Sequence, residues 1–107
     1  MNLFTGLILQ DEKHSCNCGK YDGHQGWRCN HCGEPILIEG KARNKDVVCY
    51  RIPPEELEEG MYLFTGEHFY KVLHIFDPVD EKRMYVNLQG FGSYPVSLSN
   101  YLLVMYM

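Results

Sequence analysis

The residues best suited to chemistry gather in one stretch of the chain, between positions 14 and 35. Cysteines occur there in two pairs, each followed directly by glycine: Cys16 and Cys18, then Cys29 and Cys32. Zinc binds tetrahedrally to thiolate and imidazole groups, and structural sites are closed by four protein ligands. Glycine after each pair lets the backbone turn through positive φ, with its amide directed back at a thiolate. The spacing therefore predicts a Zn²⁺ site made of these four cysteines.

Three histidines in the same stretch are alternative ligands or neighbours of the site. The C-x-C spacing of the first pair is tight, because two ligands that flank one extended residue share a side only if the backbone kinks. His14 is therefore kept as a replacement for Cys16 or Cys18 in a mixed site. His31 lies between two ligands and His24 lies in the intervening loop, so both are expected outside the ligand set.

The predicted metal is structural and not catalytic. A catalytic zinc keeps an open coordination position and has a general base nearby. Four thiolates fill that shell, and their charges reduce the Lewis acidity of the ion. The sequence also contains neither the H-x-E…C-x-x-C pattern of deaminases nor the H-E-x-x-H pattern of metalloproteases. We therefore expect a non-enzymatic protein whose metal supplies folding free energy.

The fifth cysteine, Cys49, stands apart from the cluster in "VVCYRI". A cysteine in such an apolar strand is most simply a buried residue. The alternative is a nucleophile that uses His68 or His74 as its base. An enzyme that depends on Cys49 or on an open zinc site is the least favoured hypothesis.

Length and cysteine usage limit the class of protein. The chain has 107 residues, enough for one compact domain or two small ones. Two halves of this size would each be short of core, so a metal is expected in at least one. The N-terminal "MNLFTGLILQDEK" has no basic region, and no apolar run reaches the roughly 20 residues that span a bilayer. Cysteines arranged for metal binding indicate a reducing compartment, so a cytoplasmic location is expected.

Charge is uneven along the chain and argues against one class of function. The formal net charge is −4, with +1 up to Arg51 and −5 from Ile52 onward. A protein that binds nucleic acid without sequence preference needs a basic field over its surface. The acidic balance excludes that class.

Most apolar runs of the chain are short and bounded by turn residues, so the predicted fold class is mostly β. Before the proline pair at 53–54, the apolar runs predict strands at 3–9, 26–29, 35–39 and 46–52. A helical turn or two is predicted over 54–59, where prolines and glutamates favour a helix start. Five further strands are predicted at 61–64, 68–76, 83–89, 94–98 and 101–106, with a 3₁₀ turn before the last.

The two halves each resemble a known small fold. The knuckles "CNCG" and "CNHCG", followed by strands, resemble a zinc ribbon over residues 3–52, with C-x-C where the ribbon usually has C-x-x-C. The segment "ELEEGMYLFTGEHFYKVLHI" and three further strands resemble an SH3-like barrel of the KOW or Tudor type over residues 56–106. The resemblance implies a zinc-ribbon module at 1–52 and a five-stranded SH3-like β-barrel at 53–107. Zinc ribbons recur in the transcription and translation machinery, and SH3-like barrels serve as docking surfaces.

Residues that contact a partner are expected away from the metal. The turn "KARNK" offers cations that suit phosphates or an acidic partner, although a solvated turn is the simpler interpretation. Trp27 is either a cap on the small core or an exposed anchor, and Phe91 between two glycines is expected on a turn. Together with Lys20 and Arg28, Trp27 and this turn would form one basic and aromatic face. The candidate partner-binding residues are Trp27, Lys41, Arg43, Lys45 and Phe91.

The leading hypothesis is a zinc-stabilised adaptor or regulator that binds a larger protein assembly. Its size and acidic balance suit an inhibitor of the kind that phages and mobile elements encode. The alternative is an accessory protein of the transcription or translation machinery that binds nucleic acid through Trp27 and the "KARNK" turn. No membrane and no small-molecule substrate is expected in either case.

Overall fold

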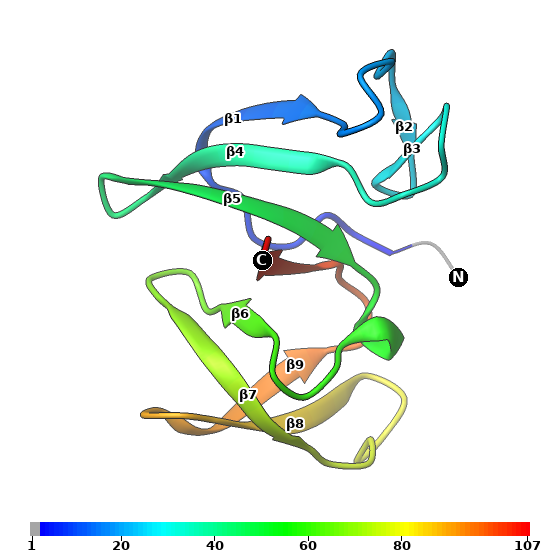
Figure 1. Cartoon of the computed structure of the whole chain (residues 1–107). Coiled ribbons are helices and arrows are strands. Elements are labelled where there is room, and N and C mark those ends of the chain that lie inside the picture. The colour runs from blue at the N-terminus through cyan, green and yellow to red at the C-terminus, as the bar shows by residue number, and fades with distance from the viewer. Residues whose placement is uncertain (1–2) are drawn as a thin grey trace.

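Antiparallel strands joined by short turns make up most of the computed structural model, which describes residues 3–107 (Figure 1). The predicted mostly-β class is confirmed. The elements are β1 (Gln10–Ser15), β2 (His24–Gln25), β3 (Arg28–Cys29), β4 (Leu37–Ala42), β5 (Lys45–Ile52), η1 (Pro54–Glu56), β6 (Tyr62–Phe64), β7 (Phe69–Ile75), β8 (Arg83–Leu88), β9 (Gly92–Ser97) and β10 (Leu102–Met105).

Eight of the strands form one sheet in the order β1-β4-β5-β10-β6-β7-β8-β9, and β2 pairs only with β3. The last strand thus inserts between the two halves of the chain: Leu102 pairs with Ile52 of β5, and Val104 pairs with Leu63 of β6. The predicted boundary between the two domains, between residues 52 and 53, falls just before η1. Strands from both sides of this boundary belong to one sheet, because β5 and β6 both pair with β10. The division into two domains stays a prediction.

Two cores lie on opposite faces of β10, because successive side chains of a strand point to opposite sides. Leu102 and Val104 face one core and Leu103 faces the other. The large core contains Ile52, Leu57, Leu63, Val72, Met84, Val86, Leu88, Val96, Leu102 and Val104. The small core contains Leu9, Cys29, Ile36, Ile38, Cys49, Phe64 and Leu103.

The β4–β5 hairpin carries the predicted polar turn at its tip. Both strands extend further than predicted, so that only Arg43 and Asn44 lie between them. Their φ angles of 50° and 68° are those of a type I′ turn, which matches the twist of the flanking strands. A similar two-residue turn, Gly26–Trp27, with φ of 59° and 63°, joins β2 to β3.

Several predicted elements differ from the structure. No strand covers residues 3–9, because Gly6 has a φ of +77° and the backbone bonds of this segment go elsewhere. Phe4 forms an isolated bridge with Asn100, and the Leu9 amide donates to the Glu12 carboxylate. The predicted strand at 26–29 is reduced to β3. The helical segment is the single turn η1, and a plain turn at Leu98–Ser99 replaces the predicted 3₁₀ turn.

Candidate metal centre

The four predicted cysteine ligands converge at one end of the molecule. The Sγ atoms of Cys16 and Cys32 lie 3.4 Å apart and those of Cys18 and Cys29 lie 3.8 Å apart. All four sulfur atoms lie within 4.8 Å of one another. A tetrahedral ion with sulfur bonds of about 2.3 Å sets its ligands about 3.8 Å apart. The cluster is therefore close enough to hold a metal ion, and its donor set fits a closed tetrahedral site.

The first cysteine pair follows β1 and sits in a tight turn. The Gly19 amide donates to the Cys16 carbonyl oxygen at 3.0 Å, and Gly19 has a φ of +73°. This turn supplies the backbone kink that a C-x-C pair needs. Cys16 and Cys18 consequently face the same centre despite the single residue between them.

The second cysteine pair begins at the end of β3, where Cys29 is buried. The Gly33 amide donates to the Cys29 carbonyl oxygen at 2.9 Å, with φ of +78° at Gly33. The expected positive φ is thus found after both pairs, but the glycine amides donate to carbonyl oxygens and not to sulfur. The Cys29 Sγ is approached instead by the amides of His31, at 3.4 Å, and of Cys32.

The surroundings of Cys29 and Cys16 shift the pKa values of these two thiols in opposite directions. The amides of Cys32 and His31 point at the Cys29 sulfur and lower its pKa to about 7. At Cys16 the amide of Cys18 also lowers the pKa, but the Cys32 thiol, burial and the other sulfur atoms raise it to about 12. A bound cation would allow all the thiols to ionise together, because metal ligation requires the thiolate form.

The histidines of this stretch lie outside the ligand group. The His14 ring lies 3.2 Å from the Glu12 carboxylate and makes a T-shaped contact with the Trp27 ring. His24 Nδ1 lies 2.7 Å from the Tyr21 hydroxyl, and its ring stacks on Trp27 with centroids 4.5 Å apart. His31 is exposed. Among residues 3–107, the only group of ligand atoms close enough to share an ion is the four cysteines.

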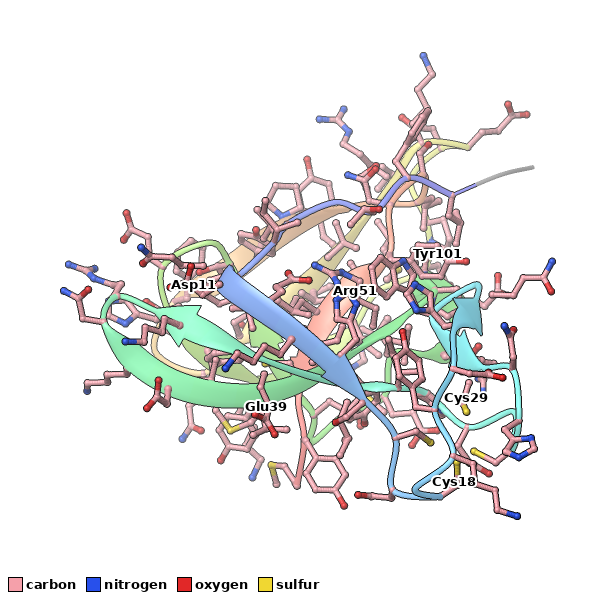
Figure 2. The ribbon with its side chains drawn as sticks, turned by 90° about the horizontal axis from the view of Figure 1, so that it is seen from above. Asp11, Cys18, Cys29, Glu39, Arg51 and Tyr101 are labelled. Atoms are coloured by element: carbon pink, nitrogen blue, oxygen red, sulfur yellow. The ribbon has the colours of Figure 1, made fainter. Side chains whose placement is uncertain are left out.

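A buried ion pair beneath the metal loop was not predicted from the sequence. The Arg51 side chain, labelled in Figure 2, is fully buried. It donates to both Glu12 carboxylate oxygens, at 3.0 and 2.6 Å. Arg51 also donates to the Leu7 carbonyl oxygen at 2.9 Å, and its guanidinium lies 4.2 Å from the Trp27 ring centroid. Burial alone would raise the pKa of Glu12, but hydrogen bonds from Arg51, Leu9 and His14 hold it at about 2.

Trp27 packs against the ion pair of Arg51 and Glu12 through the Arg51 guanidinium. The indole is half-buried among the side chains of His14, His24 and Arg51, and so anchors the loop between the cysteine pairs to β5. Arg51 lies near the end of β5 that is remote from the β4–β5 turn. Seven residues of extended chain span about 20 Å, so Trp27 and the "KARNK" turn do not form one face.

The other candidate partner-binding residues gather at the opposite end of the sheet. Three turns lie on that side of the molecule, on the left of Figure 1: β4–β5, β6–β7 and β8–β9. Arg43 Nη1 lies 3.1 Å from His68 Nε2 and 3.6 Å from the Glu67 carboxylate. Phe91 is 51% exposed, as its place on a turn predicts. Lys41 and Lys45 are exposed beside the same turn.

Cys49 is completely buried in β5, as its sequence context predicts. Burial raises the pKa of its thiol to about 12. His68 is engaged with Arg43, and His74 Nδ1 lies 3.2 Å from the Glu59 carboxylate. Within residues 3–107, neither histidine forms a hydrogen bond with this thiol.

Comparisons with protein-family models, with curated proteins and with solved structures find no match. Within residues 3–107, no helix is long and apolar enough to cross a membrane. The resemblances to a zinc ribbon and to an SH3-like barrel therefore stay predictions.

Proposed function

We propose that the chain is a non-enzymatic adaptor or regulator in which a structural zinc ion orders one end of the sheet. The opposite end binds a partner protein. The cytoplasm is the proposed location. In this proposal the metal shapes the protein, and recognition occurs on the surface around Arg43 and Phe91.

The chemistry of the donor set supports zinc. Four thiolates arranged within one tetrahedral volume are the usual ligands of structural zinc, and they leave no position for a substrate. Cys16, Cys18, Cys29 and Cys32 would hold the ion. The buried pair of Glu12 and Arg51 would hold the loop that carries these ligands against the sheet.

One observation carries the proposed partner surface: exposed and half-exposed rings make a continuous path from Arg43 to Tyr94. The centroid distances are 6.2 Å for His68 and Tyr70, 5.3 Å for Tyr70 and Phe91, and 5.4 Å for Phe91 and Tyr94. Arginine and aromatic side chains dominate binding energy at protein interfaces. We call this set the tip surface; its members are Arg43, His68, Tyr70, Phe91 and Tyr94.

Nucleic-acid binding is the second candidate, because Lys41, Arg43 and Lys45 lie next to the rings of the tip surface. Cationic side chains beside aromatic rings are suited to single-stranded nucleic acid, because the rings stack on its bases and the cations contact its phosphates. Two observations favour a protein instead. Arg43 lies 3.6 Å from the Glu67 carboxylate, which offsets its charge, and the chain has a net charge of −4.

Affinity capture with matched variants tests the proposal. Tagged wild-type protein, Phe91→Ala and Phe76→Ala are incubated with an extract of the source cell, and captured proteins are identified by mass spectrometry. Phe76 is the control because it is 46% exposed, similar to Phe91, but lies outside the tip surface. We expect a partner that is retained by wild type and Phe76→Ala and lost with Phe91→Ala.

Binding to labelled single-stranded DNA and RNA at low and high salt separates the two candidates. A steep loss of binding with salt and with alanine at Lys41, Arg43 and Lys45 would support the second candidate. The protein-binding proposal fails if no captured protein depends on Phe91.

A further inference from the structure

A groove of about 570 Å³ opens beside the metal centre, at the end of the sheet opposite the tip surface. It runs between the cysteine loops on one side and the start of β4, Tyr50 of β5 and the residues after β10 on the other. Residues that line it include Cys16, Cys32, Glu34, Leu37, Tyr50 and Tyr106. The groove thus joins the ligand sulfur atoms to an apolar and aromatic wall.

The charge of the groove is negative on one side. Four thiolates outweigh the charge of a divalent ion, and three of the cysteines line the groove. Glu34 adds an exposed carboxylate that has no cation within ion-pair distance among residues 3–107. No lysine or arginine lines the groove. An anionic ligand would be repelled, whereas a cation would be attracted.

The other wall suits the stem of a long basic side chain. Leu37 and Pro35 provide aliphatic surface, and Tyr50 and Tyr106 provide rings. Lysine and arginine lay their methylene stems along apolar surface and keep the charged group at a polar site. Aromatic faces also attract their cationic groups.

The Tyr106 side chain is held in place by the metal loop. Its hydroxyl accepts a hydrogen bond from the Asn17 amide at 3.2 Å, and its backbone amide donates to Val48 at 2.8 Å. Asn17 lies between the first two cysteines, so an ordered metal loop fixes one wall of the groove.

We propose that this groove binds a lysine or arginine side chain of a partner protein. The chemistry is charge complementarity with the thiolates and Glu34, combined with contact to the two tyrosines. The inference depends on the metal-loaded site of the proposed function, but it concerns a surface separate from the tip surface. The chain would then contact its partner assembly at two opposite ends.

Peptide titration tests the inference with the zinc-loaded full chain. The probes are an acetylated, amidated Gly-Ser-Arg-Gly-Ser-Gly peptide and the same peptide with glutamine in place of arginine. Amide ¹⁵N–¹H spectra are recorded up to peptide concentrations on the order of 1 mM and above, because a single side chain binds weakly. We expect the arginine peptide alone to shift resonances of residues 16–18, 34–37 and 106.

Matched variants make the test specific. Glu34→Gln should weaken binding of the arginine peptide about two- to fivefold, the range for an exposed charge pair. Glu81→Gln removes an exposed carboxylate from a distant loop and should leave the affinity unchanged. Equal binding of the two peptides would overturn the inference. So would shifts that centre instead on Asp11 of β1 and Glu39 of β4, two exposed acidic residues outside the groove.

Zinc content of each variant separates this inference from the proposed function. If wild type and Glu34→Gln both hold one zinc ion and bind the arginine peptide equally, the groove is not the site, while the Phe91-dependent capture is unaffected. If the wild-type protein holds no zinc, the proposed structural metal fails first.

Discussion

The large core and the small core are stabilised by different kinds of interaction. The large core consists of ten buried apolar residues enclosed by β5 to β10 and η1. The small core has seven buried residues, and two of them are cysteines. Beside it lie the ion pair of Arg51 with Glu12, the ring of Trp27 and the group of four cysteine sulfur atoms.

The difference shows how a short chain orders a segment that cannot bury enough apolar surface. Between Ser15 and Ile36 the chain has only two-residue strands, so loops carry most of the backbone. Buried charges are costly unless they are paired, and the Arg51 pair meets that condition while binding the loop to β5. An ion pair between Arg28 and Glu56, at 2.7 Å, also connects the loop to η1. The metal-side segment thus depends on a few specific contacts.

The largest effect is expected from loss of one sulfur ligand. Cys29→Ser should release the metal and disorder the segment from Cys16 to Ile36, because structural zinc contributes on the order of 10 kcal/mol to small zinc modules. Amide spectra should lose the resonances of this segment and keep dispersed signals for Val72 and Val86. Cys49→Ala is the control, since it removes a buried thiol outside the cluster and should retain the metal. Unchanged metal content in Cys29→Ser would contradict the assignment.

The next largest effect is expected at the buried ion pair. Glu12→Gln should lower the free energy of unfolding by about 3 kcal/mol, because Arg51 would keep its buried charge without a counter-charge. The double variant Glu12→Gln with Arg51→Met should recover much of this loss. Urea denaturation followed by fluorescence of Trp27, the only tryptophan, measures both. A single variant as stable as wild type would show that the pair does not stabilise the loop.

A smaller effect is expected in the large core. Val86 is 0% exposed, and Val86→Ala should cost about 2 kcal/mol from lost burial and the cavity left behind. Val79, which is 60% exposed, is the matched control, and Val79→Ala should change stability by less than about 0.5 kcal/mol. Circular dichroism in urea measures both variants. Zinc affinity should be the same in both, and a loss of zinc in Val86→Ala would show that the two cores are not separable.

The smallest effect is expected from pH. Burial, with the nearby charges of His14 and Arg51, lowers the pKa of His24 below its usual value of 6.5. The unfolded chain therefore takes up this proton at higher pH than the folded chain. The contribution of uncharged His24 to the stability of the fold is therefore complete above about pH 6.5 and is lost as the pH falls below that value. With zinc in excess, stability should fall more steeply towards pH 5.5 in wild type than in His24→Gln. Parallel curves would show that His24 does not contribute to the pH dependence of stability.

The sequence was sufficient for features that depend on local spacing. The two "C-G" steps identified the four cysteines that meet, and apolar runs bounded by turn residues located β4 to β10. The sequence left open whether His14 replaces Cys16 or Cys18 as a ligand, because the C-x-C spacing is compatible with a four-cysteine set and with a mixed set. In the structure, the turn at Gly19 brings both Cys16 and Cys18 into the group of four sulfur atoms.

Features that depend on long-range pairing could not be predicted. Glu12 and Arg51 are 39 residues apart and carry no local signal of their contact. The insertion of β10 between β5 and β6 is similarly a long-range property of the sheet. The apolar run at 3–9 suggested a strand, yet its backbone groups bond to Ser99, Tyr101 and the Glu12 carboxylate.

X-ray absorption at the zinc edge, on protein purified under reducing conditions, tests the central assignment most directly. We predict one zinc ion per chain with four sulfur ligands at about 2.3 Å. A nitrogen or oxygen atom in the first coordination shell, or a chain that folds with no bound metal, would contradict the closed site of Cys16, Cys18, Cys29 and Cys32.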